Sequence, residues 1–165
     1  MRAAVELTER AGATAFPLLA YLVLVICTFK WQCRPIPDRL QAQLDGRMNV
    51  NLTFVGVALA VINLLITMPP LGLTNIQGAI KYFAVSLSCF LISYLLLHLR
   101  LMRLFETASD AFTANGLWTT LVGLRALFIV VSMPQVSRIF GIALLVLFAG
   151  VCADLVLRFR TREKK

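Results

Sequence analysis

Charged residues are scarce in this sequence. They account for 15% of its 165 residues, whereas hydrophobic residues account for 59%. A soluble domain averages about 25% charged and roughly 45–50% apolar residues, and a disordered chain is more polar still. This composition therefore excludes most soluble and disordered classes and indicates an integral membrane protein.

Acidic residues are fewer than basic ones, 8 against 16, which leaves a formal charge of +8. A basic chain often binds nucleic acid, but here the basic residues stand between long apolar runs, where they are typical of membrane topology determinants. A nucleic-acid interface would need a folded soluble module, and no segment is long enough to supply one. We therefore expect no nucleic-acid partner.

The sequence also has few residues suited to metal binding or catalysis. His98 is the single histidine, and the four cysteines show no CxxC spacing, so a zinc site or a disulfide framework is not expected. We interpret the cysteines as buried thiols. A Ser-His-Asp set, paired carboxylates within a span and a glycine-rich phosphate loop are also missing. These absences predict a protein that is not an enzyme and that has no cofactor and no metal.

Long apolar runs are abundant, and a run of about 20 residues crosses a bilayer as a helix. We predict an all-α, polytopic helical membrane protein with a single domain over residues 1–165 and four to five transmembrane helices. The predicted spans are residues 15–31, 49–70, 78–103, 116–133 and 138–158. Arg125 interrupts the fourth of them, and four spans remain if that segment only dips into the membrane.

The stretches between the spans are polar. Residues 32–47 are expected to form a loop and then a short polar helix, and residues 104–115 a polar connector. Residues 134–137 are a link so short that the last two spans form a tight hairpin. Residues 1–14 are interpreted as a solvated terminus, with a short amphipathic helix as the alternative.

Basic residues gather in the loops after the first and third spans and in the tail. Cytoplasmic loops are enriched in lysine and arginine, so we predict the N-terminus outside and the C-terminus in the cytoplasm, in the plasma (inner) membrane. The basic face is expected to contact membrane lipids, including anionic ones. The candidate headgroup contacts are Arg158, Arg160 and Arg162.

Two charged residues inside the predicted spans are candidates for chemistry. A charge near the bilayer centre costs roughly 2.5–3.5 kcal/mol or more, so Arg125 needs a partner or a water path. Asp154 is the acid inside a predicted span, and the two side chains are a candidate intramembrane polar pair. The alternative is that Asp154 pairs with Arg158 one turn further on, while Arg125 extends toward the inner headgroups.

Small and polar residues inside the spans are typical of helix packing, because they let backbones approach closely or form hydrogen bonds between helices. This packing serves contacts within one chain or between chains. The candidates are Asn63, Gly56, Ala60, Ser88, Ala149 and Ala153.

These features favour a non-enzymatic small integral membrane protein that acts as a structural, assembly or regulatory subunit of a larger membrane complex. Its expected partner is another membrane protein or copies of itself. The alternative is a small oligomeric transporter or channel with Arg125 and Asp154 on the permeation path. A lipid-modifying enzyme ranks third.

Overall fold

The computed structural model describes residues 16–34, 41–67, 73–99, 102–131 and 133–163, and these residues form helices without any strand. The all-α prediction is therefore confirmed, whereas the prediction for residues 1–14 lies outside the described residues. The helices are α2 (Phe16–Gln32), α3 (Gln41–Thr67), α4 (Leu73–Leu99), α5 (Arg103–Val130) and α6 (Pro134–Glu163).

Three of the helices are long and apolar enough to cross a membrane. The candidate spans are Gln43–Thr67 in α3, Gln77–Leu99 in α4 and Pro134–Arg160 in α6. Helix α2 contributes a shorter apolar stretch, Phe16–Phe29, and α5 does not qualify. Length and composition thus identify a helical membrane protein with three candidate spans.

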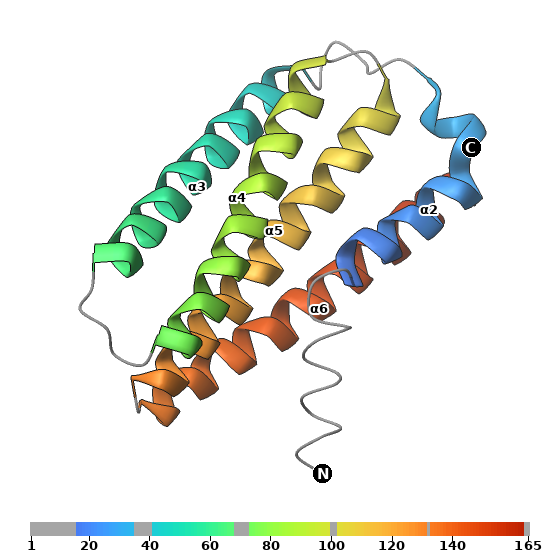
Figure 1. Cartoon of the computed structure of the whole chain (residues 1–165). Coiled ribbons are helices and arrows are strands. Elements are labelled where there is room, and N and C mark those ends of the chain that lie inside the picture. The colour runs from blue at the N-terminus through green and yellow to red at the C-terminus, as the bar shows by residue number, and fades with distance from the viewer. Residues whose placement is uncertain (1–15, 35–40, 68–72, 100–101, 132, 164–165) are drawn as a thin grey trace.

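Helix α5 is nevertheless the central element of the bundle. It packs against α4 over most of its length and also contacts α2 and α6, while α3 packs on the far side of α4 (Figure 1). Consecutive long helices are antiparallel, so α2, α4 and α6 end where α3 and α5 begin. We call this the basic end, because Arg34, Arg47, Arg103, Arg158 and Arg160 lie there.

The prediction of a polar connector at residues 104–115 is wrong. This segment is the first half of α5, and its polar side chains face neighbouring helices: Thr107 and Ser109 are each only 1% exposed. A polar stretch persists as a helix inside a bundle when its side chains find hydrogen-bond partners there. The sequence indicates the polarity of this segment, but the partners that bury it come from distant parts of the chain.

Several other helix boundaries differ from the predicted spans. Helix α3 begins at Gln41 rather than at residue 49, α4 begins at Leu73, and α6 begins at Pro134, inside the predicted link. Proline is well suited to the first turn of a helix, where its missing N–H is not needed. Helices of 27 to 30 residues are about 40–45 Å long and extend beyond the hydrocarbon layer.

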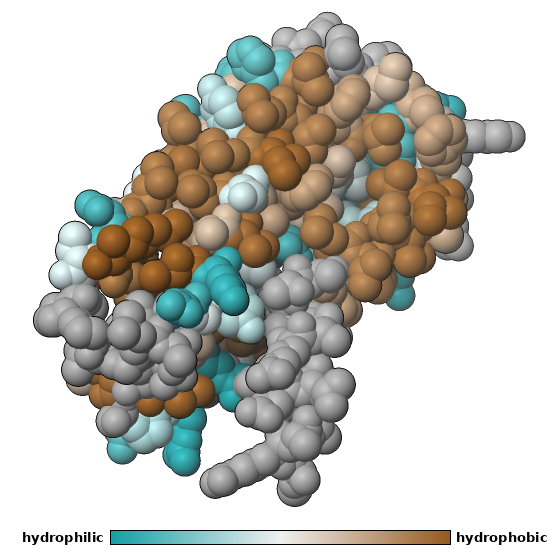
Figure 2. Space-filling model, viewed as in Figure 1, coloured by the Kyte–Doolittle hydropathy of each residue, from teal (hydrophilic) through white to brown (hydrophobic). Residues whose placement is uncertain are grey.

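The interface between α4 and α5 is closely packed at two glycines of α5. A Cβ atom added at Gly116 of α5 would lie 2.9 Å from the ring of Phe90, and one at Gly123 would lie 3.1 Å from Cβ of Tyr82. Glycine therefore permits this close approach of the two helices. The outer faces of α3 and α6 instead expose aliphatic side chains such as Leu64 and Leu145, and brown side chains dominate the surface in Figure 2.

Candidate functional site

A chain of ion pairs joins α3, α5 and α6 at the basic end. Asp110 of α5 is its centre: its Oδ1 accepts a hydrogen bond from Nη1 of Arg47 at 3.1 Å, and its Oδ2 accepts one from Nη2 of Arg158 at 2.6 Å. Arg47 also donates to Glu106 at 3.2 Å. The Asp110 side chain is only 18% exposed. Two arginines from different helices therefore neutralise a largely buried carboxylate.

The chain of ion pairs continues to α2. Nε of Arg158 donates to Oδ2 of Asp154 at 2.7 Å, and the hydroxyl of Tyr21 donates to the same oxygen at 2.7 Å. The guanidinium of Arg158 also lies 5.8 Å from the centre of the Tyr21 ring, within the range of a cation–π contact. The arrangement, Glu106 included, connects α2, α3, α5 and α6 through six side chains.

A second, uncharged cluster lies one turn deeper. Ser93 of α4 accepts a hydrogen bond from Asn51 of α3 at 2.8 Å and lies 2.6 and 2.7 Å from the hydroxyls of Ser109 and Thr113 of α5. Thr113 in turn donates to the amide oxygen of Asn51 at 3.1 Å. Buried polar groups with this many partners fix the relative positions of the helices that carry them.

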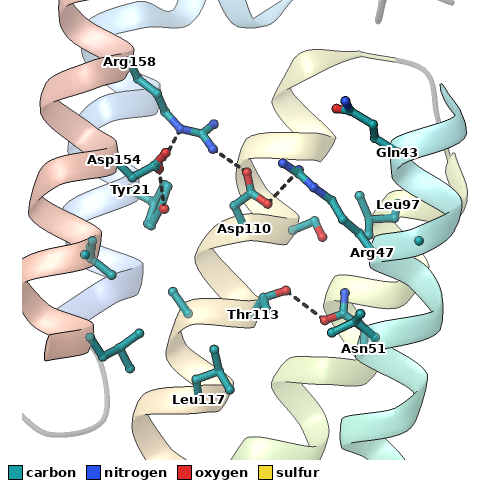
Figure 3. Close-up of a pocket in the computed structure, with 17 residues that line it drawn as sticks. Tyr21, Gln43, Arg47, Asn51, Leu97, Asp110, Thr113, Leu117, Asp154 and Arg158 are labelled. Carbon is teal, nitrogen blue, oxygen red and sulfur yellow. Dashed lines mark hydrogen bonds and ion pairs between the residues drawn. The ribbon is translucent and has the colours of Figure 1, made fainter. Parts of the chain in front are cut away.

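The ion-pair chain forms the polar end of an open cleft of about 630 Å³ between α3 and α6. Figure 3 shows Arg47 and Arg158 entering the cleft from opposite sides and meeting Asp110 on α5. The other end of the cleft is apolar and is lined by Leu117 and Leu147, among others. The cleft is therefore amphipathic, and α5 forms its floor.

The predicted pairing of Arg125 with Asp154 does not match the positions of the two side chains. Asp154 pairs with Arg158, which confirms the alternative of a contact one turn apart. Arg125 follows Asp110 by 15 residues on α5, a separation of about 22 Å along the helix. It lines a different cleft, of about 750 Å³, together with Arg138 and Trp118. Because α5 begins at Arg103, Arg125 lies near the opposite end of the helix and not at its middle.

The three predicted headgroup contacts differ in their surroundings. Arg158 is only 22% exposed and faces inward, where Asp110 and Asp154 balance its charge, and its contact with headgroups stays a prediction. Arg160 is exposed, as a headgroup contact would be. The side chain of Arg162 lies outside the described residues.

The predicted helix-packing residues all lie on outer faces of the chain. The residues Asn63, Gly56, Ala60, Ser88, Ala149 and Ala153 are exposed. A Cβ atom added at Gly56 would meet nothing within 4 Å. Contacts within the chain are therefore not their role, and the small residues that do pack helices together are Gly116 and Gly123.

The prediction of buried thiols is confirmed for Cys89, whereas Cys27 and Cys33 are exposed and Cys152 is intermediate. Among the described residues no group of three or more His, Cys, Asp or Glu side chains could hold a metal ion. The chemistry of the candidate site thus consists of charge pairing and hydrogen bonding.

Sequence reasoning missed Arg47, Asp110 and Tyr21 as members of the site. Arg47 and Asp110 were assigned to segments between spans, where a charge needs no partner. The available signal was helical spacing: Glu106 and Asp110 are four residues apart and therefore share one helix face. Two acids on one face of a helix favour a basic partner nearby.

The chain matches no protein-family model, no curated protein and no solved structure with which it was compared.

Proposed function

We propose that this protein is a non-enzymatic integral membrane protein that acts as a structural, assembly or regulatory subunit of a larger membrane complex. The observation that carries the proposal is the outward position of its small residues. Gly56, Ala60 and Asn63 are exposed on α3 at positions i, i+4 and i+7, which lie on one helix face.

Helix faces formed by small residues associate in membranes, because the backbones can approach closely and polar side chains can form hydrogen bonds between the helices. The exposed amide of Asn63 lies inside the candidate span Gln43–Thr67, where a neighbouring helix can offer it a hydrogen bond. A second helix packed on this face would supply one. Ala149 and Ala153 form a similar exposed pair on α6.

The test is the mass of the tagged protein purified in native lipid discs. We expect a species heavier than the 18.3 kDa chain, containing either further copies or a stoichiometric second protein. The double variant Gly56→Leu with Ala60→Leu is expected to release the single chain. Gly78→Leu is the matched control, because Gly78 also has no atom within 4 Å of an added Cβ but lies on α4. A wild-type protein that is monomeric and alone would contradict the proposal.

The alternative function is a small oligomeric transporter or channel. It receives less support, because Arg125 and Asp154 line separate clefts instead of one path. Flux measurements distinguish the two functions: Arg125→Ala abolishes flux in a transporter that still assembles, whereas a subunit has no flux to lose.

We further propose that the basic end faces the cytoplasm of the plasma (inner) membrane, with the N-terminus outside. The support is the positive-inside rule, since the described loop and helix ends at the basic end carry most of the arginines. The anionic lipids of that leaflet are attracted to this end, and Arg160 is exposed there.

A further inference from the structure

The cleft between α3 and α6 has the dimensions and the lining of a binding site. Its volume of about 630 Å³ falls within the range of small-molecule sites. Both walls present a glycine, Gly46 on α3 and Gly150 on α6, and a Cβ atom added at either would meet nothing within 4 Å. The walls therefore leave open space where larger side chains would fill the cleft.

Two polar groups at the charged end retain hydrogen-bonding capacity. Both ion pairs of Arg47 use Nη1, so its Nε and Nη2 have no ion pair with the described residues, and its side chain is 42% exposed. Both contacts of Asp154 reach Oδ2, which leaves Oδ1 without a donor among these residues, and its side chain is 39% exposed. One wall thus offers donors to an anion, and the opposite wall offers an acceptor to a cation.

The position of the cleft relative to the candidate spans determines what can enter it. Arg47 lies one turn inside the Gln43 end of its span, and Asp154 lies six residues from the Arg160 end of the α6 span, or roughly 9 Å. The charged end is therefore at headgroup depth. The apolar end, with Leu117 and Leu147, is at the depth of the acyl chains.

The charges of the cleft cancel. Arg47 and Arg158 carry two positive charges, and Asp110 and Asp154 carry two negative ones. A purely anionic or purely cationic headgroup would leave one wall unsatisfied. A headgroup with both a phosphate and a hydrogen-bonding ammonium matches the two walls.

We propose that the cleft binds one membrane phospholipid with a zwitterionic headgroup that carries a primary ammonium. Its phosphate binds Nε and Nη2 of Arg47, its ammonium donates to Oδ1 of Asp154, and one acyl chain lies over Leu117 between α3 and α6. A methylated ammonium lacks the N–H group that this acceptor requires, so the site distinguishes phosphatidylethanolamine from phosphatidylcholine. The site does not depend on whether the outer face of α3 associates with a partner.

The experiment is native mass spectrometry of the full chain, delipidated in mild detergent and then given equal concentrations of phosphatidylethanolamine, phosphatidylcholine and phosphatidylglycerol. We expect one phosphatidylethanolamine to bind per chain and to be retained about tenfold more than either other lipid. One charge-assisted hydrogen bond accounts for a difference in affinity of this size. Soluble glycerophosphoethanolamine is expected not to compete, because it has no acyl chain for the apolar end.

Cleft-filling variants locate the bound lipid. Gly150→Leu and Gly46→Leu are expected to abolish the selective adduct, whereas Gly78→Leu, at an equally open glycine outside the cleft, retains it. Asp154→Asn is expected to remove the preference for phosphatidylethanolamine over phosphatidylcholine; its thermal unfolding is recorded beside it to verify the fold. Equal retention of all three lipids, a preference for phosphatidylglycerol, or an adduct that survives Gly150→Leu would each overturn the proposal.

Discussion

Asp110 is the residue at which the contacts of α3, α5 and α6 converge. It accepts hydrogen bonds from Arg47 and Arg158, while Glu106 on the same face accepts only from Arg47. Removing a partly buried carboxylate that two arginines share leaves both cations without their common partner. The two acids, one turn apart, are therefore expected to differ in their contribution to stability.

We predict that Asp110→Asn lowers the free energy of unfolding by about 1.5–3 kcal/mol, the range for hydrogen bonds to charged groups. Glu106→Gln is expected to cost less than about 1 kcal/mol, because Arg47 keeps its bond to Asp110. The measurement is reversible unfolding of each variant in mixed micelles. Equal losses of unfolding free energy in the two variants would show that the second arginine contact of Asp110 adds no stability.

Ser93 provides a second residue-scale prediction, because it contacts three side chains of two other helices and is fully buried. Ser93→Ala leaves the amide of Asn51 without its acceptor, and we expect a loss of about 1–3 kcal/mol. The control is Ser88→Ala, since Ser88 is exposed and bonds only to the carbonyl of Ala84 in its own helix. Its expected effect is close to zero, and the same unfolding assay compares the two.

At the scale of elements, α5 combines a polar first half with a central position. Its polar side chains are paired with α2, α3, α4 and α6, as in the hydrogen bond from Thr107 to Gln32 at 2.8 Å. Two of the candidate spans, in α4 and α6, pack directly against α5, and the third, in α3, packs against α4. Helix α5 is not among the candidate spans, yet α2, α4 and α6 all pack against it.

The close packing of α4 on α5 leads to a prediction at this scale. Gly116→Leu places atoms where the ring of Phe90 lies, and Phe90 is itself 1% exposed and stacked on Phe54 at 4.9 Å. We expect the overpacking to cost about 1–3 kcal/mol and to separate the two helices. Gly78→Leu on α4 is the matched control, with unchanged unfolding expected. An unaffected Gly116→Leu variant would show that the ring moves away easily.

At the scale of the whole molecule, charge is distributed unevenly between the two ends. The basic end contains the ion-pair chain and the exposed Arg160, whereas the other end has Lys81, Arg125 and Arg138 among the described residues. This asymmetry is the basis of the proposed orientation.

Thiol accessibility checks the orientation. In one variant Cys33, which is exposed at the basic end, is the single cysteine; in a second, cysteine-free chain, Gln135→Cys marks the opposite end. We expect a membrane-impermeant maleimide added to intact cells to label Gln135→Cys, and to label Cys33 only after permeabilisation. Both variants are also labelled in detergent, to show that each thiol reacts. The reverse pattern would invert the proposed topology.

The sequence by itself determined the class of the protein and much of its helix content. Apolar runs of about 20 residues form helices in a bilayer, because each backbone N–H and C=O must then form its hydrogen bond within its own segment. The pairing of Asp154 with Arg158 was also accessible, since residues four apart on a helix are neighbours whatever surrounds them.

Only the tertiary structure decided where the polar residues belong. The helical form of residues 104–115, the inward position of Arg158 and the distance of Arg125 from Asp154 all depend on which helices lie side by side. Arg47 and Asp110 are 63 residues apart in the chain yet share an ion pair, and no local pattern encodes such a contact. The outward faces of Gly56 and Ala60 and the inward ones of Gly116 and Gly123 follow from the same helix arrangement, because a glycine has no side chain of its own to indicate its environment.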